Sequence, residues 1–272
     1  MFIISSTPGR LGNQIYQLFN IIYSALENKQ QINVEKLKDL SFIFNIKLIT
    51  DNFNLLYKEN NLIKYYHFFP RNLHLVEKRT INLEEYFNIS KQFIQPYMID
   101  LPSLESTICV IHMRSGDQFK NSNTHPSYVQ PPLNYYCKII DEFDDRYSKF
   151  IVLTEPDMKN PCINALKNYS NKVEIRSNTT EEDYKFLLRA QNIVLCRSTF
   201  SDSVVFLSKH IKNLYLWNYC HCFTNTSIIP KHINVKSLEL EKPYIECGSW
   251  KNNNEQLQLM INYKKEDIKF VN

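Results

Sequence analysis

The sequence predicts an α/β protein, and three observations support this. From residue 107 onward, short apolar runs alternate with longer segments of helical periodicity, the pattern of parallel strands joined by crossover helices. A strand, a glycine-containing loop and a helix are expected at the N-terminus. The chain has 272 residues, of which 43% are hydrophobic and 13% aromatic, so it is long and apolar enough to bury a core.

The N-terminal part is expected to begin with a strand over residues 2–5, followed by a polar loop that ends at Gln14. Asn13 is expected to open a helix. Its apolar positions repeat at helical spacing: Ile15, Leu18, Phe19, Ile22 and Leu26. A helix N-terminus beside a glycine loop favours an anionic or hydroxyl-rich ligand. The loop spacing is neither GxGxxG nor that of a Walker loop, so neither NAD nor P-loop chemistry is predicted.

Residues 31–101 alternate polar loops with short apolar pieces, and residues 84–95 are expected to form an aromatic-rich helix. We interpret residues 96–102 as a linker. The strands expected beyond it are 107–113, 149–154, 173–176, 192–196 and 213–217. The helices expected between them are 132–143, 159–169, 181–190 and 199–208.

These elements divide the chain into three parts. We expect an N-terminal α/β domain over residues 1–102 and a Rossmann-like nucleotide-binding domain over residues 103–235. The remaining tail, residues 236–272, contains one expected helix over residues 254–262 and is expected to pack back on the N-terminal domain.

Composition argues against several classes of protein. The net charge of +4 is modest and the basic residues are scattered among acidic ones, so nucleic-acid binding is not predicted. No apolar run approaches about 18 residues and the N-terminus lacks the pattern of a signal peptide, so no transmembrane segment is expected. The seven cysteines are an odd number, and several lie in apolar runs, which favours a reducing, cytoplasmic location. Cys220-His221-Cys222 lacks further ligands at zinc-site spacing, so no zinc site is predicted.

Two glycine-containing stretches stand out as a candidate site. The chain has only four glycines, and three of them lie in the stretches Pro8–Gln14 and His112–Asp117. Glycine is needed where the backbone has positive φ or approaches a ligand closely. We interpret the two stretches as walls of one active site; the alternative is that they are ordinary turns.

Polar residues at the ends of the expected strands suggest a diphosphate site. Arg114 can make two charge-assisted bonds to phosphate oxygens, and Asp117 is either a reacting group or a partner that orients Arg114. His112 either contacts a base or ribose or is a buried core histidine. Ser198 or Thr199 begins a helix after a strand, where hydroxyl and N–H groups can hold phosphate.

Several stretches resemble the α-1,2-fucosyltransferase family in order along the chain. Gly9–Gln14 resembles its G-x-L-G-N-Q start, and His112–Asp117 resembles its H-x-R-R-G-D motif. Tyr86-Phe87, Tyr135-Tyr136 and residues 192–201 follow in the expected order, so the resemblance extends to about Ser208. It implies an inverting, metal-independent glycosyltransferase of the GT-B type, with two Rossmann-like domains and the donor site in the C-terminal one. It also implies GDP-fucose as donor, a glycan as acceptor and no cofactor.

The resemblance also assigns roles by position. It implies that Arg114 binds the β-phosphate, His112 contacts the nucleoside and Asp183 accepts hydrogen bonds from guanine. The implied diphosphate ligands are Thr199, Phe200 and Ser201, next to Ser198. The residues implied to line the acceptor side are Gly9, Asn13 and Gln14.

The chain departs from the family pattern at Ser115, where the second arginine of the motif is expected. Losing that charge would weaken donor binding by about 1–3 kcal/mol if nothing replaced it. The alternatives are therefore a different nucleotide-sugar donor, or a catalytically inactive protein that binds a nucleotide sugar or glycan. Asp117 and His125 are both candidates for the general base. The acidic cluster Asp141–Asp145 is expected to be a solvated helix face and not a metal site.

Overall fold

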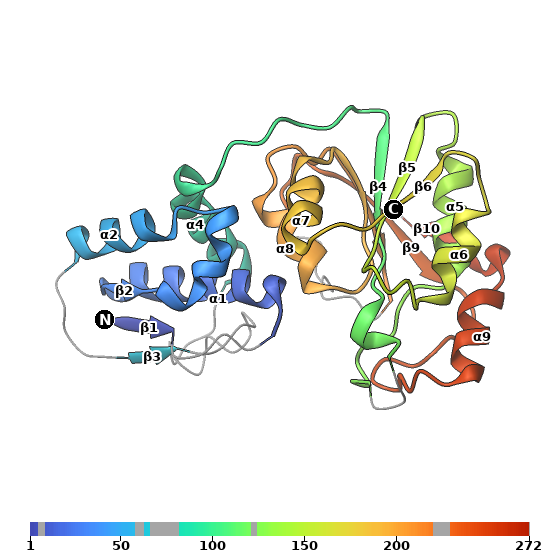
Figure 1. Cartoon of the computed structure of the whole chain (residues 1–272), viewed down its shortest axis with the longest axis horizontal. Helices are drawn as coiled ribbons and strands as arrows, with labels where there is room; N and C mark the ends of the chain where they lie inside the picture. Colours follow the sequence, from blue (N-terminus) through green and yellow to red (C-terminus); the bar gives the residue numbers. More distant parts are fainter. Residues whose placement is uncertain (5–8, 58–62, 66–81, 121–123, 220–228, 272) are drawn as a thin grey trace. The chain divides into compact units, whose positions relative to one another are not determined.

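The computed structural model describes residues 1–4, 9–57, 63–65, 82–120, 124–219 and 229–271. They form two compact units, unit 1 mainly from Met1–Leu101 and unit 2 mainly from Pro102–Asp202 and Pro230–Asn272. Each unit contains helices and a sheet of mainly parallel strands (Figure 1), so the predicted α/β class is confirmed.

Unit 1 contains a small sheet with the strand order β2-β1-β3, in which β1 pairs in parallel with both neighbours. Its strands are β1 (Phe2–Ile4), β2 (Ile32–Asn33) and β3 (Ile63–Tyr65). Its helices are α1 (Leu11–Asn28), η1 (Glu35–Phe42), α2 (Ile46–Leu56), α4 (Leu83–Ile94) and η3 (Gln95–Tyr97). Helix α1 contacts both β1 and α4 and so holds the unit together.

The packing of α1 follows its apolar repeat. Ile15, Leu18, Phe19 and Ile22 are completely buried. The helix begins at Leu11 with Arg10 as N-cap and without a capping side chain, so the expectation that Asn13 opens it was wrong and Asn13 lies in the first turn. The buried Tyr86 hydroxyl group of α4 donates to Asn20 Oδ1 at 2.6 Å, which fixes the two helices against each other.

Unit 2 contains a seven-stranded sheet with the order β10-β9-β8-β7-β4-β5-β6. The strands are β4 (Ile108–His112), β5 (Lys149–Leu153), β6 (Val173–Arg176), β7 (Asn192–Val194), β8 (Asn213–Trp217), β9 (Asn234–Leu240) and β10 (Ile268–Val271). All neighbouring pairs are parallel except β9–β10. Counted from β4, the six parallel strands have the order 3-2-1-4-5-6 of a doubly wound fold. Every strand expected between residues 107 and 217 is present, with ends that shift by no more than two residues.

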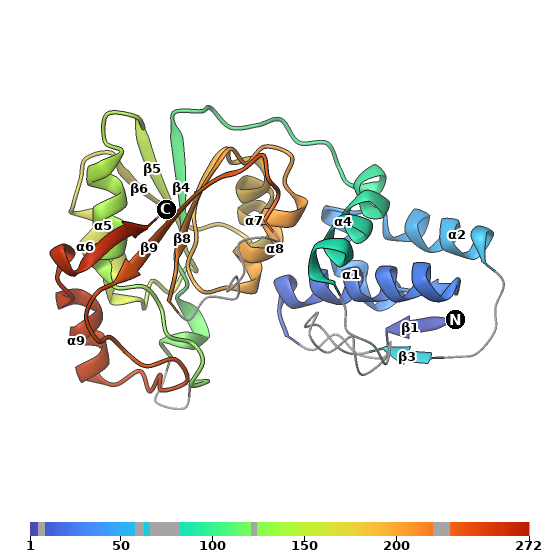
Figure 2. The same cartoon turned by 180° about the vertical axis from the view of Figure 1, so that it is seen from behind.

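Helices cover both faces of this sheet (Figures 1 and 2). They are α5 (Leu133–Glu142), α6 (Pro161–Lys167), α7 (Thr180–Arg189) and α9 (Asn254–Asn262). Helix α8 (Thr199–Leu207) begins in unit 2, and its residues Ser203–Leu207 belong to unit 1. Helices α5, α6 and α9 contact one another and form one layer, with α7 on the opposite face. Thr179 and Glu182 form a capping box at the start of α7, so the sequence itself fixes where this helix begins.

The C-terminal stretch differs from the expectation. Residues 236–272 were expected to pack on the N-terminal domain, but β9, α9 and β10 belong to unit 2. Strand β9 pairs in parallel with β8, and β10 then pairs with β9. Leu238, Met260 and Ile268 are completely buried in the core of unit 2, so burial of these three side chains explains why the stretch stays there.

The first residues of the linker expected over residues 96–102 form regular secondary structure. Residues 95–97 form η3, and the Ile99 N–H donates to the Ile43 carbonyl oxygen at 2.9 Å. The boundary between the two compact units follows Leu101. Within the described part of the chain, no helix has both the length and the apolar character needed to cross a membrane.

Candidate active site

The strand order predicts where unit 2 binds a ligand. In a doubly wound sheet the ligand lies beyond the carboxyl ends of the strands at which the chain reverses direction across the sheet. Those strands are β4 and β7, which pair directly from Cys109↔Asn192 to Ile111↔Val194. The residues that follow them, Met113–Phe119 and Leu195–Thr199, therefore lie at this point of the sheet.

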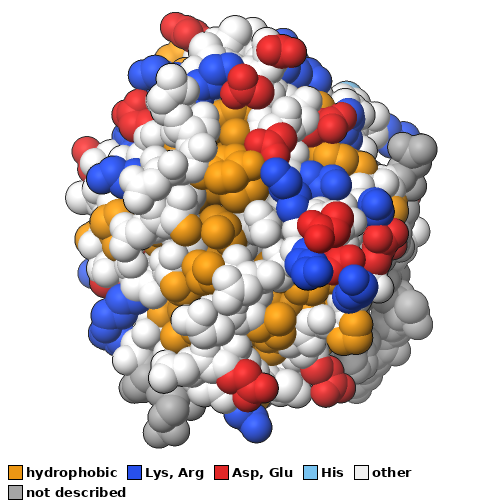
Figure 3. Space-filling model, turned by 90° about the vertical axis from the view of Figure 1, so that its right-hand side faces the viewer, with side chains coloured by type: hydrophobic (Ala, Val, Ile, Leu, Met, Phe, Trp, Pro, Cys, Tyr) orange, Lys and Arg blue, Asp and Glu red, His pale blue; other side chains and the backbone are white. Residues whose placement is uncertain are grey.

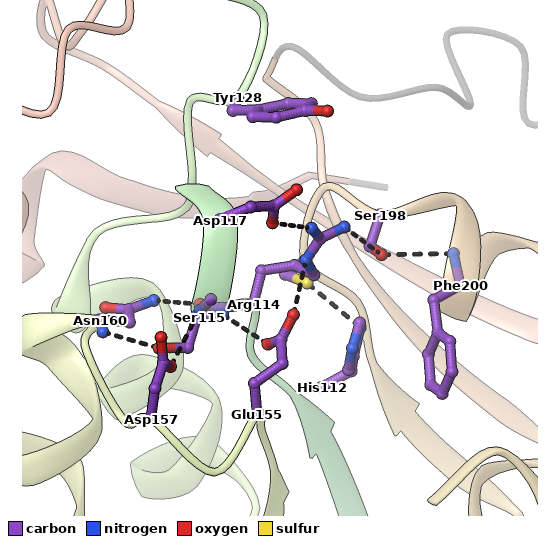
Figure 4. Close-up of polar contacts among 12 residues, drawn as sticks. His112, Arg114, Ser115, Asp117, Tyr128, Glu155, Asp157, Asn160, Ser198 and Phe200 are labelled. Atoms are coloured by element: carbon purple, nitrogen blue, oxygen red, sulfur yellow. Dashed lines mark hydrogen bonds and ion pairs between the residues drawn. The ribbon is translucent and has the colours of Figure 1, made fainter. Parts of the chain in front are cut away.

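Arg114 lies at the centre of this region (Figure 4). Its Nη2 forms an ion pair with Asp117 Oδ1 at 2.7 Å, and its Nη1 donates to Ser198 Oγ at 3.3 Å. Its Nε forms an ion pair with Glu155 Oε1 at 3.2 Å. The side chain is 12% exposed, so the guanidinium is held from three sides and still reaches the surface. This is a suitable position for a cation that binds an anionic ligand.

Three residues after β5 complete this cluster and were missed by sequence reasoning. Glu155 accepts a hydrogen bond from the Ser115 N–H at 2.6 Å, and Asp157 accepts one from the Ser115 hydroxyl group at 2.7 Å. Asn160 donates from Nδ2 to the Arg114 carbonyl oxygen at 2.9 Å. The available signal was their place directly after an apolar strand, because the carboxyl ends of neighbouring parallel strands meet at one edge.

The loop after β7 caps helix α8. Ser198 Oγ accepts the Phe200 N–H at 3.2 Å, which is the N-cap role expected for Ser198 or Thr199. Ser201 is completely buried and donates to the Ser198 carbonyl oxygen at 3.3 Å. The Ser201 hydroxyl group therefore serves the first turn of the helix, whereas Ser198 and Thr199 lie at the strand–helix junction.

His112 is buried, with 5% of its surface exposed. Its Nδ1 lies 3.2 Å from Cys196 Sγ, and its ring stacks on Phe200 with centroids 5.2 Å apart. Phe200 also packs edge-on against Tyr184 at 5.0 Å. His112 and Phe200 thus form one aromatic layer beside Arg114 (Figure 4), and the predicted contact of His112 with a nucleoside stays a prediction.

Asp183 lies in the first turn of α7, as expected, and is 8% exposed. Its Oδ2 accepts the Asn178 N–H at 3.2 Å, and its Oδ1 lies 3.6 Å from Arg176 Nε. Burial raises the pKa of Asp183 above its usual value, although the Asn178 hydrogen bond and Arg176 act in the opposite direction. Asp183 is therefore a buried carboxylate with structural partners of its own.

The two candidate bases differ in their surroundings. Asp117 is 50% exposed and lies beside Arg114. His125 is exposed, but its Nδ1 accepts the Ser127 N–H at 3.2 Å. A neutral imidazole has one lone-pair nitrogen, so this hydrogen bond occupies the only basic atom of His125.

The three predicted acceptor-side residues lie in unit 1, at the start of α1. Gly9 has a φ of +83°, and a Cβ added there would overlap the side-chain amide of Asn13. Asn13 and Gln14 are half-buried residues of the first helical turn. Gly9 is thus required by its backbone conformation. Residues 5–8, which include Pro8 of the predicted loop, lie outside the described residues.

The acidic cluster at the end of α5 forms surface ion pairs. Asp141 Oδ2 lies 2.6 Å from Lys265 Nζ, and Asp144 Oδ2 lies 2.8 Å from Lys172 Nζ. Acidic and basic side chains are also intermixed on the face drawn in Figure 3. In the described ranges, no group of three or more His, Cys, Asp or Glu side chains is arranged to hold a metal ion. The Cys220–Cys222 stretch lies outside those ranges.

No curated protein and no solved structure shows significant similarity to the chain. The family model described as glycosyl transferase family 11 matches residues 49–222, which is well over half of the 272 residues. The match contains His112–Asp117 and Arg197–Ser201 but begins after Gly9–Gln14. The chain therefore belongs to glycosyl transferase family 11, the α-1,2-fucosyltransferase family, and is a glycosyltransferase.

Proposed function

We propose that this glycosyltransferase transfers fucose from GDP-fucose to a hydroxyl group of a glycan, with inversion and without a metal ion. The observation that carries the proposal is the hydrogen bond between Arg114 after β4 and Ser198 after β7, at 3.3 Å. It joins a guanidinium to the N-terminus of a helix at the point where a doubly wound sheet binds its ligand. Both groups suit the diphosphate of a nucleotide sugar.

The same groups support metal-independent chemistry. In an inverting transfer, the acceptor oxygen attacks the anomeric carbon of the sugar, the bond to the diphosphate breaks, and GDP leaves. Negative charge then develops on the diphosphate, and Arg114 together with the N–H groups at the start of α8 would stabilise it.

We propose Asp117 as the general base that takes the proton of the acceptor hydroxyl group. It is 50% exposed and adjoins Arg114 at 2.7 Å, so a hydroxyl group approaching the donor can reach it. His125 is less suitable because its Nδ1 is occupied by the Ser127 N–H. The test is Asp117→Asn, which keeps the side-chain size; kcat should fall by about 100-fold or more, with the Kd for GDP changed far less.

A GT-B arrangement is part of the proposal, with the donor bound by the domain at residues 103–235 and the acceptor by the domain at residues 1–102. Its support is that both units contain parallel strands and flanking helices. In this arrangement Gly9, Asn13 and Gln14 would line the acceptor side.

We propose that Asp183 selects guanine. Guanine offers adjacent N1–H and N2–H groups to one carboxylate, whereas uracil offers a single N–H, so a bidentate charge-assisted pair favours GDP. The competing explanation is that Asp183 only stabilises the start of α7, where it bonds the Asn178 N–H.

Thermal shift separates these explanations. A ligand at about 100 times its Kd stabilises a protein by roughly 2.7 kcal/mol, so GDP should raise Tm clearly more than UDP or ADP at equal concentration. Asp183→Ala should remove this difference. If UDP stabilises the parent protein as well as GDP does, the guanine assignment fails.

The alternatives, another nucleotide-sugar donor or a protein that binds without turnover, are tested by one assay. Transfer and donor hydrolysis are measured with GDP-, UDP- and ADP-sugars. GDP-fucose should be the preferred donor; preference for another sugar supports the first alternative, and binding without turnover supports the second.

A cytoplasmic location also stays a prediction. Cys109, Cys137, Cys162 and Cys196 are free and buried, as expected of core residues. Cys247 is disulfide-bonded, however, and disulfides are rare in reducing compartments. Cell fractionation with thiol labelling of Cys247 tests the predicted location. A free Cys247 thiol in the cytoplasmic fraction would support the prediction, and a Cys247 disulfide outside that fraction would contradict it.

A further inference from the structure

We propose that Ser115 is a positioning residue for Arg114 and does not itself bind the donor. In this proposal the Ser115 hydroxyl group, together with Asp157 and Asn160, fixes the loop after β4 so that Arg114 faces the diphosphate. These three residues are called the Ser115 network below. This inference depends on one part of the proposed function, namely that Arg114 binds the diphosphate of the donor.

The first observation behind the proposal is the direction of the Ser115 side chain. Ser115 is completely buried. Its Oγ donates to Asp157 Oδ1 at 2.7 Å and accepts the Asn160 N–H at 3.1 Å. Figure 4 shows these bonds on the opposite side of the loop from the contacts of Arg114 with Ser198 and Asp117. Position 115 therefore faces the connection between β5 and α6. The second arginine of the family motif would stand at this position, so its replacement by serine takes no charge away from the side of the loop on which Arg114 lies.

The backbone of the loop is held from the same side. Asn160 Nδ2 donates to the Arg114 carbonyl oxygen at 2.9 Å, and the Gly116 N–H donates to Asp157 Oδ1 at 3.0 Å. Asn160 is itself fixed, because its Oδ1 accepts the Cys162 N–H and caps α6. The Ser115 network thus connects the backbone on both sides of residue 115 to the start of α6.

Glu155 links this backbone to the guanidinium. Its Oε2 accepts the Ser115 N–H at 2.6 Å, and its Oε1 lies 3.2 Å from Arg114 Nε. One carboxylate therefore sets both the path of the loop and the orientation of the Arg114 side chain. A shift of the loop at residue 115 would move Arg114 relative to Ser198, which follows β7.

The charge of Asp157 agrees with this arrangement. Burial by itself raises the pKa of Asp157, but hydrogen bonds from the Ser115 hydroxyl group and the Gly116 N–H outweigh it and lower the pKa. These bonds are therefore made to the ionised carboxylate, and bonds to a charged acceptor are stronger than neutral ones.

Ser115→Ala tests the proposal, with Ser208→Ala as the matched control. Ser208 is also a buried serine of unit 2; its hydroxyl group donates to the Leu188 carbonyl oxygen at 2.7 Å and accepts the His210 N–H at 3.1 Å. It precedes β8 and so lies at the opposite edge of the sheet from Arg114. Each variant loses one buried hydroxyl group that donates one hydrogen bond and accepts another. The acceptor of the Ser115 hydroxyl group is a carboxylate and that of Ser208 is a neutral carbonyl group, so Ser115→Ala should lose at least as much stability as Ser208→Ala.

The measurement is the Kd for GDP, UDP, ADP and guanosine by calorimetry. Ser115→Ala should raise the Kd of the preferred diphosphate by about tenfold and leave that of guanosine, which has no phosphate, unchanged. Ser208→Ala should change neither. In an Arg114→Lys background, Ser115→Ala should have no further effect, because both changes act on one contact. Ser115→Arg, which restores the family motif, should weaken diphosphate binding.

Three results would overturn the proposal: tighter diphosphate binding by Ser115→Arg, an equal loss of GDP and guanosine affinity in Ser115→Ala, or additive effects with Arg114→Lys. Preference for UDP or ADP would instead contradict the proposed donor, and the effect of Ser115→Ala would then be measured with that nucleotide. If no diphosphate binds the parent protein, both proposals fail.

Discussion

Arg114→Lys is the substitution whose effect can be worked out most fully from the structure. Each of the three guanidinium nitrogens of Arg114 has its own partner: Asp117, Ser198 and Glu155. A lysine ammonium is a single point and cannot keep this orientation while presenting two donors to a diphosphate. Losing one charge-assisted hydrogen bond costs about 1.5–3 kcal/mol. Because about 1.4 kcal/mol corresponds to a tenfold change in rate, kcat/KM should fall roughly 10- to 150-fold.

The fold should tolerate the substitution. Asp117 is 50% exposed, so water can replace its ion pair, and exposed pairs contribute only about 0–1 kcal/mol. With the weaker Glu155 contact included, we expect the free energy of unfolding to fall by about 1–2 kcal/mol.

The assay is steady-state transfer with varied donor concentration, together with urea unfolding of the same preparations. Arg146→Lys is the control, because Arg146 is exposed and precedes β5, at the amino edge of the same sheet. Its kcat/KM should match that of the parent protein. A normal kcat/KM for Arg114→Lys would refute the assignment of Arg114 to the diphosphate. If the loss of activity were fully explained by the loss of folded protein, the reasoning that Arg114→Lys acts through lost contacts to the diphosphate would be refuted.

Three further predictions concern metal, pH and stability. If Arg114 and the start of α8 stabilise the diphosphate as proposed, transfer should survive excess EDTA; activity lost with EDTA and restored by Mn²⁺ or Mg²⁺ would contradict this. Because burial raises the pKa of Asp183 above its usual value, acidification should protonate Asp183 at a higher pH than an ordinary aspartate and remove the preference for GDP over UDP; a preference that persists at a pH where ordinary aspartates are protonated would count against the guanine contact. Tyr135→Phe removes bonds to the Leu195 and Tyr215 carbonyl oxygens at 3.1 and 3.2 Å, so urea unfolding should show a loss of about 1–3 kcal/mol; an unchanged midpoint would contradict it.

The central strands were predictable because they are buried on both faces and therefore form continuous apolar runs. Cys109, Val110 and Ile111 of β4 are all completely buried. Strand β9 gives no such run: Lys236 and Glu239 interrupt it, and Leu238 is its one fully buried residue. Its pairing with β8 depends on the tertiary core, so the sequence alone assigned this stretch to a separate tail.

The position of the polar cluster around Arg114 was predictable from the sequence, but its contacts were not. The rule that ligands bind at the carboxyl ends of parallel strands led to Arg114 and Ser198, and it applied equally to Glu155. What the sequence does not contain is the direction of each side chain in a loop. Ser115 was therefore interpreted as a lost charge beside the diphosphate, whereas its hydroxyl group lies on the other side of the loop, with Asp157.

The hydrogen bond between Arg114 and Ser198 also has a consequence for folding kinetics. It joins residues that are 84 positions apart in the chain, and contacts between such distant residues form late because a long loop must first be closed. A nucleotide that binds both residues therefore stabilises the native state without stabilising the folding transition state. Such a ligand should slow unfolding and leave the folding rate nearly unchanged. The donor would then lengthen the lifetime of the folded enzyme without speeding its formation.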